Sequence, residues 1–331
     1  MNKPNMDSMD WFAADVTWQL LGYPTLNSFL QTWVPKARFH SLVPEDVRNA
    51  YRTTSYLLAN SWHHYPMYDQ GLQHLLGILE MAVKFRAEQL GIAVTSSSQH
   101  RHSQPPKLAN LIDLVCRRAQ AQELKQKLHW ARKMRNYHAH PDRYRFAPVV
   151  MQQAVLPLLN LLNELFIDPM QATQAEQQMR QLRRHSQVLH GKLLILEYQG
   201  LRYLMHQAEP LRAFYSADHW RSLWAFYPVL PQAHESLSQH RYLPPIVLSL
   251  RAVEKESGGF QALDVTTGRL VRVLVNQDVR NQEVWEAHQQ AWRLADRTDR
   301  WLFASSQQSN VRRAQHQLEH EFGWSYGGGA V

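Results

Sequence analysis

The sequence is short of cysteine, of long apolar runs and of signals for export. Its 331 residues contain one cysteine, Cys116, so no internal disulfide can form and a zinc site built on thiolates is not expected. No window approaches about 18 consecutive apolar residues, and the opening MNKPNMDSMDWF lacks a basic region followed by an apolar stretch. The sequence therefore predicts a cytoplasmic protein that does not cross a membrane.

Motifs of the common cofactor and hydrolase sites are also missing. There is no Walker loop, no dinucleotide-binding glycine pattern, no His-Glu-x-x-His and no nucleophile elbow. The pairs His63-His64 and His100/His102 fall in expected turns or loops and have no cysteine nearby. We therefore expect no cofactor and no metal site.

The composition is that of a folded, basic protein. Hydrophobic residues make up 44% of the chain, and the length suits about two domains. With 36 Lys+Arg against 28 Asp+Glu the formal net charge is +8, and 18 histidines add positive charge below neutral pH. A polyanionic partner is compatible with this balance.

The first half of the chain has the periodicity of helices. Apolar residues recur at spacings of three and four between Asp69 and Gly91, and glycine favours a stop there. A polar loop is expected over 95–106. Further helices are expected from Leu108, over 122–139 before Pro141, and over 149–166, where Pro157 favours a kink or local break. This half is predicted to be all-helical.

In the second half of the chain the spacing of apolar residues changes from the three-and-four spacing of helices towards the alternation that is typical of strands. Strands are expected at 193–198, 245–253 and 269–275, and two glycine turns around FQALDV favour a β-meander. Aromatic-rich helices are expected over 211–227 and 285–303. The predicted fold class is α+β: a helical domain over 1–166, a Gln-rich connector over 167–190, an α+β domain over 191–322 and a flexible tail over 323–331.

One segment combines several residues suited to chemistry. Residues 132–141 read Arg-Lys-Met-Arg-Asn-Tyr-His-Ala-His-Pro, so that Arg135 and His140 are separated by four residues and Asn136 directly follows the arginine. A histidine that titrates near neutrality suits proton transfer, and a guanidinium suits binding of phosphate oxygens. The segment is thus the strongest candidate site in the chain.

The segment resembles the Arg-x4-His signature of HEPN domains, whose frequent local form is Arg-Asn followed by Ala-His. The helix LLGILEMAVKFRAEQLG is similar to the family's second helix, with Glu80 as the acidic residue inside an apolar stripe. The resemblance covers about residues 46–166. It implies a HEPN-like helical bundle and a metal-independent endoribonuclease that cuts RNA by attack of the 2′-hydroxyl. It also implies a toxin or antiviral defence effector, working as a homodimer or with a partner subunit.

The residues can be assigned roles within this interpretation. The predicted catalytic residues are Arg135, His140, Asn136 and His138, with Glu80 and Tyr137 supporting them and Arg132 and Lys133 binding RNA. On one continuous helix, five residues turn through about 500°, which leaves Arg135 and His140 about 140° apart. Either the helix unwinds before Pro141, or the groups meet through a partner subunit. The apolar residues of 149–166 cover more than one face, as expected for a helix that also packs against a partner.

Plainer interpretations of the same residues remain open. A histidine at a helix end can offset the helix dipole, and Arg135 and Asn136 can cap carbonyls. Glu80 has Lys84 four residues later, the spacing of a surface ion pair. The alternative function is therefore a non-catalytic helical scaffold that binds RNA or a protein.

Two further groups have competing interpretations. The basic pairs Arg117-Arg118 and Arg183-Arg184 fit solvated helix faces better than phosphate contacts. An aromatic set suits core packing better than base stacking. Its members are Phe214, Tyr215, Trp220, Trp224, Phe226 and Tyr227.

Overall fold

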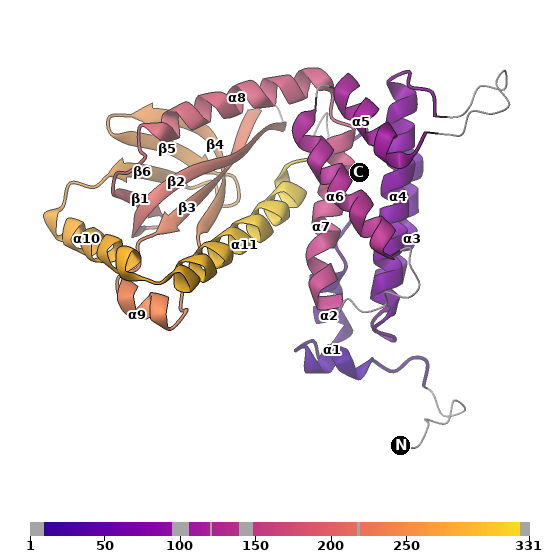
Figure 1. Ribbon diagram of the computed structural model, residues 1–331, viewed down its shortest axis with the longest axis horizontal. Coiled ribbons are helices and arrows are strands. Elements are labelled where there is room, and N and C mark those ends of the chain that lie inside the picture. Colours follow the sequence, from indigo (N-terminus) through magenta and orange to yellow (C-terminus); the bar gives the residue numbers. More distant parts are fainter. Residues whose placement is uncertain (1–9, 95–105, 120, 139–147, 217–218, 325–331) are drawn as a thin grey trace. The chain divides into compact units, whose positions relative to one another are not determined.

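The computed structural model describes residues 10–94, 106–119, 121–138, 148–216 and 219–324. The chain divides at Pro169–Met170 into two compact units, each with its own hydrophobic core. The first unit is helical, and the second combines six strands with helices (Figure 1). The predicted α+β fold is confirmed. No helix in the described part of the chain has the length and apolar character needed to cross a lipid bilayer.

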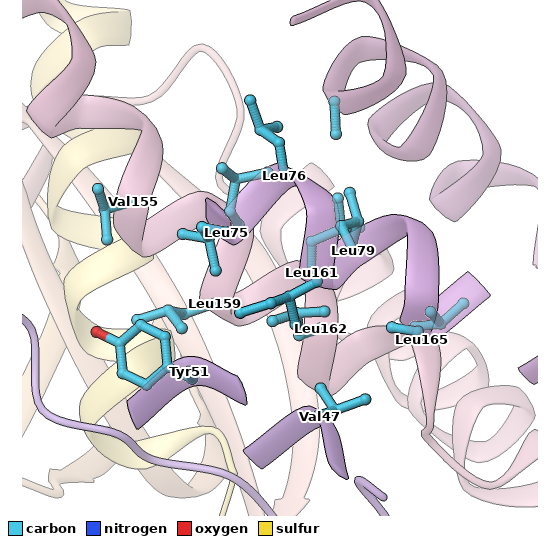
Figure 2. Packing of buried hydrophobic residues seen from close by; sticks show 14 of the residues in the cluster. Val47, Tyr51, Leu75, Leu76, Leu79, Val155, Leu159, Leu161, Leu162 and Leu165 are labelled. Carbon is cyan, nitrogen blue, oxygen red and sulfur yellow. The ribbon is translucent and has the colours of Figure 1, made fainter. Parts of the chain in front are cut away.

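The helical unit is built around α4. Its helices are α1 (Val16–Leu20), α2 (Leu26–Trp33), α3 (Glu45–Asn60), α4 (Met67–Gln89), α5 (Leu108–Arg118), α6 (Gln122–His138) and α7 (Pro148–Leu165). Leu75, Leu76 and Leu79 of α4 lie in one core with Val47 of α3 and Leu162 of α7 (Figure 2). The apolar period of α4 thus forms a buried face, as the spacing predicts.

Helix α7 has no break at Pro157, although proline removes one helix hydrogen bond. Six of its apolar residues between Val155 and Leu165 are buried at 0–2% exposure. These are Val155, Leu158, Leu159, Leu161, Leu162 and Leu165. They belong to the core cluster of the helical unit, so this part of α7 packs inwardly, and the partner contact that the sequence suggested stays a prediction.

The second unit is a closed antiparallel sheet with flanking helices. Its strands are β1 (Leu194–Tyr198), β2 (Leu201–Ser216), β3 (His219–Pro228), β4 (Ile246–Glu256), β5 (Gly259–Asp264) and β6 (Leu270–Val275). Each strand pairs with the next, and β1 also pairs with β6, where Leu194 lies opposite Val275. The predicted meander over β4–β6 is confirmed, and it continues around the whole sheet.

Four helices complete this unit: α8 (Pro169–Gln187), α9 (Ala233–Ser238), α10 (Val279–Leu294) and α11 (Arg297–Phe322). The segment assigned as a connector is α8, and its Met179 and Leu182 pack with the interior of the closed sheet. The predicted tail over 323–331 lies outside the described residues beyond Trp324.

Two helix predictions in this half were wrong. Residues 211–216 belong to β2 and residues 219–227 to β3, and the two strands pair with Tyr215 opposite Trp220, because cross-strand pairing overrides the local pattern. The helix predicted over 285–303 is two helices. The second begins after Asp296, whose side chain accepts from the Asp299 backbone N–H at 2.7 Å and so caps α11.

A stack of aromatic rings at α10 makes this unit sensitive to acid. His206 of β2 stacks on Trp285 and His288 of α10, with ring centroids 5.8 Å and 5.4 Å away, and lies 6.0 Å from Tyr227. Burial lowers the pKa of His206 to about 4, helped by the charge of His288, whose own pKa burial also lowers. Both rings are therefore neutral in the folded unit at neutral pH.

We expect the second unit to lose stability as pH falls. A lowered histidine pKa means that the unfolded chain binds protons more readily below pH 6.5. From His206 alone the free energy of unfolding should drop by about 2 kcal/mol between pH 7.5 and pH 5. Urea midpoints at these two pH values measure the drop. His206→Phe keeps a ring on Trp285 and should flatten the pH dependence, and an unchanged slope in that variant would contradict the assignment.

Candidate functional site

The segment with the Arg-x4-His pattern forms the last turns of α6 and lies against α4. Gln73 Nε2 of α4 donates to the His138 carbonyl at 3.5 Å, and Glu80, two turns further along α4, contacts Arg135. Residue numbers rise along one helix as they fall along the other, so α4 and α6 are antiparallel. The Gln73 contact provides a donor for the carbonyl of the last described residue of α6.

Arg135 is held by a carboxylate from α4. Glu80 Oε2 accepts from Arg135 Nη2 at 2.7 Å, while Glu80 Oε1 accepts from Lys84 Nζ at 2.9 Å. The Arg135 side chain is 43% exposed and that of Glu80 22%. An ion pair this open contributes no more than about 1 kcal/mol, so its main effect is to orient the guanidinium. Glu80 therefore binds both Lys84, four residues later on its own helix, and Arg135 on α6.

Three polar side chains at this helix end face solvent. Arg135 Nη1 donates to Asn136 Oδ1 at 3.4 Å, and Asn136 and Lys133 are exposed. Arg132 is partly buried, and its Nε meets no acceptor among the described residues. Arg135 and Asn136 thus present a cation and an amide together, and Lys133 adds an exposed cation on the same helix.

His138 turns partly inward. Its ring is half-buried, its centroid lies 5.9 Å from that of Tyr137, and its Nε2 has no hydrogen-bond partner in the described part of the chain. Burial lowers the pKa of His138, which keeps the imidazole neutral at pH 7. A neutral ring can accept a proton, although this nitrogen is enclosed by protein.

The hollow between α4, α5 and α6 is too small for a substrate. It has a volume of about 10 Å³, room for about one water molecule. Arg132, Arg135 and Glu80 lie at its rim, and apolar residues such as Leu79 and Leu128 form its walls. A ligand of Arg135 must therefore bind on the outer surface of the helix pair, which suits a polymer better than a small molecule.

The structure does not describe the second half of the motif. Ala139 and His140 lie outside the described residues, as do His100 and His102. What the structure brings together is Arg135, Asn136 and Glu80 at one point, with His138 and Tyr137 one turn further. Chemically, this is an oriented guanidinium next to an amide, an arrangement that binds an oxyanion.

The structure also locates the other residues that the sequence singled out. Arg117, Arg118, Arg183 and Arg184 are exposed, as on a solvated helix face. His63 Nδ1 lies 3.1 Å from the Ala13 carbonyl oxygen, and no group of three metal-ligating side chains occurs among the described residues. Of the aromatic set, Phe214, Trp224 and Phe226 are core residues, whereas Tyr215, Trp220 and Tyr227 remain partly exposed.

Gln73 is the one site residue that the sequence did not single out. It lies in the apolar stripe of α4, one turn before Gly77, and nothing in its local pattern marks a partner on α6. Only the antiparallel register of the two helices brings it to the end of the motif.

No protein family model matches the chain, and no similar protein was found among curated sequences or among solved structures.

Proposed function

We propose that the helical unit is a metal-independent endoribonuclease of HEPN type. The observation that carries this is the placement of Arg135: a half-exposed guanidinium at the end of α6, oriented by Glu80 at 2.7 Å and next to the Asn136 amide. RNA is a polymer of phosphodiesters, and an exposed, oriented guanidinium is suited to its non-bridging oxygens. The net charge of +8 supports the approach of a polyanion.

The proposed reaction needs no metal. The 2′-hydroxyl loses its proton to a base and attacks the neighbouring phosphorus, so that the O2′–P bond forms as the P–O5′ bond breaks and the 5′-oxygen takes up a proton. Arg135 stabilises the charge on the phosphorane oxygens, and His140 moves the protons. Asn136 and His138 assist, Tyr137 supports the helix end, and Lys133 with Arg132 holds flanking phosphates.

Assembly and biological role are part of the same proposal. A homodimer or a partner subunit would bring a second motif to the scissile phosphate, and the role would be that of a toxin or antiviral defence effector. We further propose a cytoplasmic location, because the buried Cys116 requires no oxidising compartment.

A second candidate, a non-catalytic scaffold that binds RNA or a protein, is favoured by one observation. Glu80 neutralises Arg135, and cations in the last turn of a helix offset its dipole without any ligand. Binding of RNA without cleavage, lost in Arg135→Ala, would support this scaffold.

The nuclease proposal predicts that cleavage needs no metal ion and that it leaves defined RNA ends. Cleavage of total RNA should continue in excess EDTA and leave 2′,3′-cyclic phosphate or 3′-phosphate ends. DNA of the same sequence should remain intact, because it lacks the nucleophilic hydroxyl. Gel analysis with end-group mapping measures all three. Strict magnesium dependence, or cutting of DNA, would contradict the proposed reaction.

A further inference from the structure

Strands β3 and β4 of the closed sheet stop pairing before either strand ends. Their ladder runs from the Phe226–Ile246 pair to the Arg221–Arg251 pair and ends there. Beyond Arg251 the register between β4 and its other neighbour, β5, shifts, and Ala252 has a φ of 50°. This left-handed conformation is unfavourable for alanine, and such conformations concentrate at ligand sites.

A cavity of about 310 Å³ lies where these strands stop pairing. That volume is at the lower end of the range of small-molecule sites, and it suits a ligand of mononucleotide size. Its walls combine residues of these two strands with one residue of α8. They are Gln178, His219, Trp220, Arg221, Ser222, Arg251, Ala252 and Val253. All of them belong to the second unit.

The cavity carries unbalanced positive charge. Arg221 and Arg251 are directly opposite each other on neighbouring strands, an arrangement that is destabilising for like charges. Among the described residues, no carboxylate forms an ion pair with either of them. Burial and the charge of Arg251 both lower the pKa of Arg221. An anion between the two guanidiniums would remove this repulsion.

Arg221 is oriented for such a ligand. Its Nε donates to His219 Nε2 at 3.3 Å, and its Nη1 donates to the Phe322 carbonyl at the end of α11 at 3.4 Å. The side chain of Arg251 is exposed and has no hydrogen bond in the described part of the chain. One guanidinium is therefore fixed and the other is able to close on a ligand.

We propose that this cavity binds a nucleoside monophosphate, with the phosphate between Arg221 and Arg251 and the planar base against Trp220. Guanidiniums bind phosphate oxygens through paired hydrogen bonds. Trp220 is partly exposed in the cavity wall, with its ring centroid 5.5 Å from that of Tyr215, and aromatic faces accept bases by stacking. This site is separate from the one proposed in the helical unit.

Calorimetric titration of the full chain tests the proposal, with AMP, ribose 5-phosphate, inorganic phosphate and adenosine as probes. AMP should bind most tightly and adenosine most weakly. Arg221→Gln and Arg251→Gln should each weaken AMP binding by roughly 10- to 100-fold, because each removes charged hydrogen bonds. Arg272→Gln, a matched change of an exposed strand arginine outside the cavity, should leave the affinity unchanged. Trp220→Leu should weaken AMP but not inorganic phosphate.

Thermal melting provides an independent readout. Arg251→Gln should raise the melting temperature of the ligand-free chain by about 1–3 °C, since it relieves repulsion, and should reduce the further rise caused by AMP. Equal AMP affinity in both arginine variants and the unaltered chain would overturn the proposal. So would binding of a single-stranded oligoribonucleotide with none of AMP. Neither measurement depends on RNA cleavage, so failure here is distinguishable from failure of the nuclease proposal.

Discussion

Replacement of Arg135 by alanine is expected to lower the rate of RNA cleavage by roughly 10²- to 10³-fold, the loss typical when one group that stabilises transition-state charge is removed. The side chain is largely exposed and its ion pair with Glu80 is weak, so the fold should be unaffected. Arg135→Lys should restore little activity, because an ammonium cannot form paired bonds to a phosphate. Cleavage of labelled RNA under single-turnover conditions measures both rates.

Controls separate catalysis from general loss of charge. Arg183→Ala removes an exposed arginine from α8 and should have no effect on the rate. Glu80→Gln leaves the cation in place but loosens its orientation, so it should reduce the rate by less than Arg135→Ala does. An Arg135→Ala protein that is folded and fully active would remove the basis of the proposal.

His140→Ala should have a comparable effect, and mixed subunits test the composite site. If each site takes residues from two chains, mixing inactive Arg135→Ala and His140→Ala subunits should restore partial cleavage. No recovery, together with a stable monomer in sedimentation, would exclude the dimeric arrangement.

Gly259→Ala is expected to destabilise the second unit by about 3 kcal/mol or more. A Cβ built on Gly259 would overlap the carbonyl oxygen of Val273 on the neighbouring strand β6, where the backbone cannot retreat without breaking the ladder. The effect should appear as a lower urea midpoint for the transition of this unit, followed by circular dichroism.

The same substitution at Gly77 provides the matched control. Gly77 lies within α4, and a Cβ there would meet nothing within 4 Å. Since alanine favours helix over glycine, Gly77→Ala should stabilise the helical unit by about 0.5–1 kcal/mol. Equal midpoints for Gly259→Ala and the unaltered chain would show that β5 and β6 do not approach as described.

Local patterns in the sequence were sufficient for the elements whose signals are local. The spacing of Leu72, Leu75 and Leu79 predicted α4, and the turn glycines Gly258 and Gly268 predicted the β4–β6 meander. The spacing of Glu80 and Lys84 indicated an ion pair, which the 2.9 Å contact confirms.

Features that depend on distant partners were not predictable in this way. The pattern over 211–227 is compatible with a helix, and its described residues are strands because β2 pairs with β3 and β3 pairs with β4, through contacts such as Arg221 opposite Arg251. The cavity depends on that pairing and on the position of α8. The Gln73 contact with the end of α6 likewise requires the register of two helices.

The closure of the sheet between β1 and β6 also has a kinetic consequence. Leu194, near the start of the second unit, pairs with Val275, although strands β2 to β5 all lie between them in the sequence. Contacts between residues so distant in sequence form only after the chain has lost most of its conformational freedom, which slows folding. In the helical unit, by contrast, α3 packs directly on α4, its neighbour in sequence. During synthesis the helical unit would therefore fold first. The edges of β1 and β6 that face each other would stay unpaired until β6 has been made and has docked on β1.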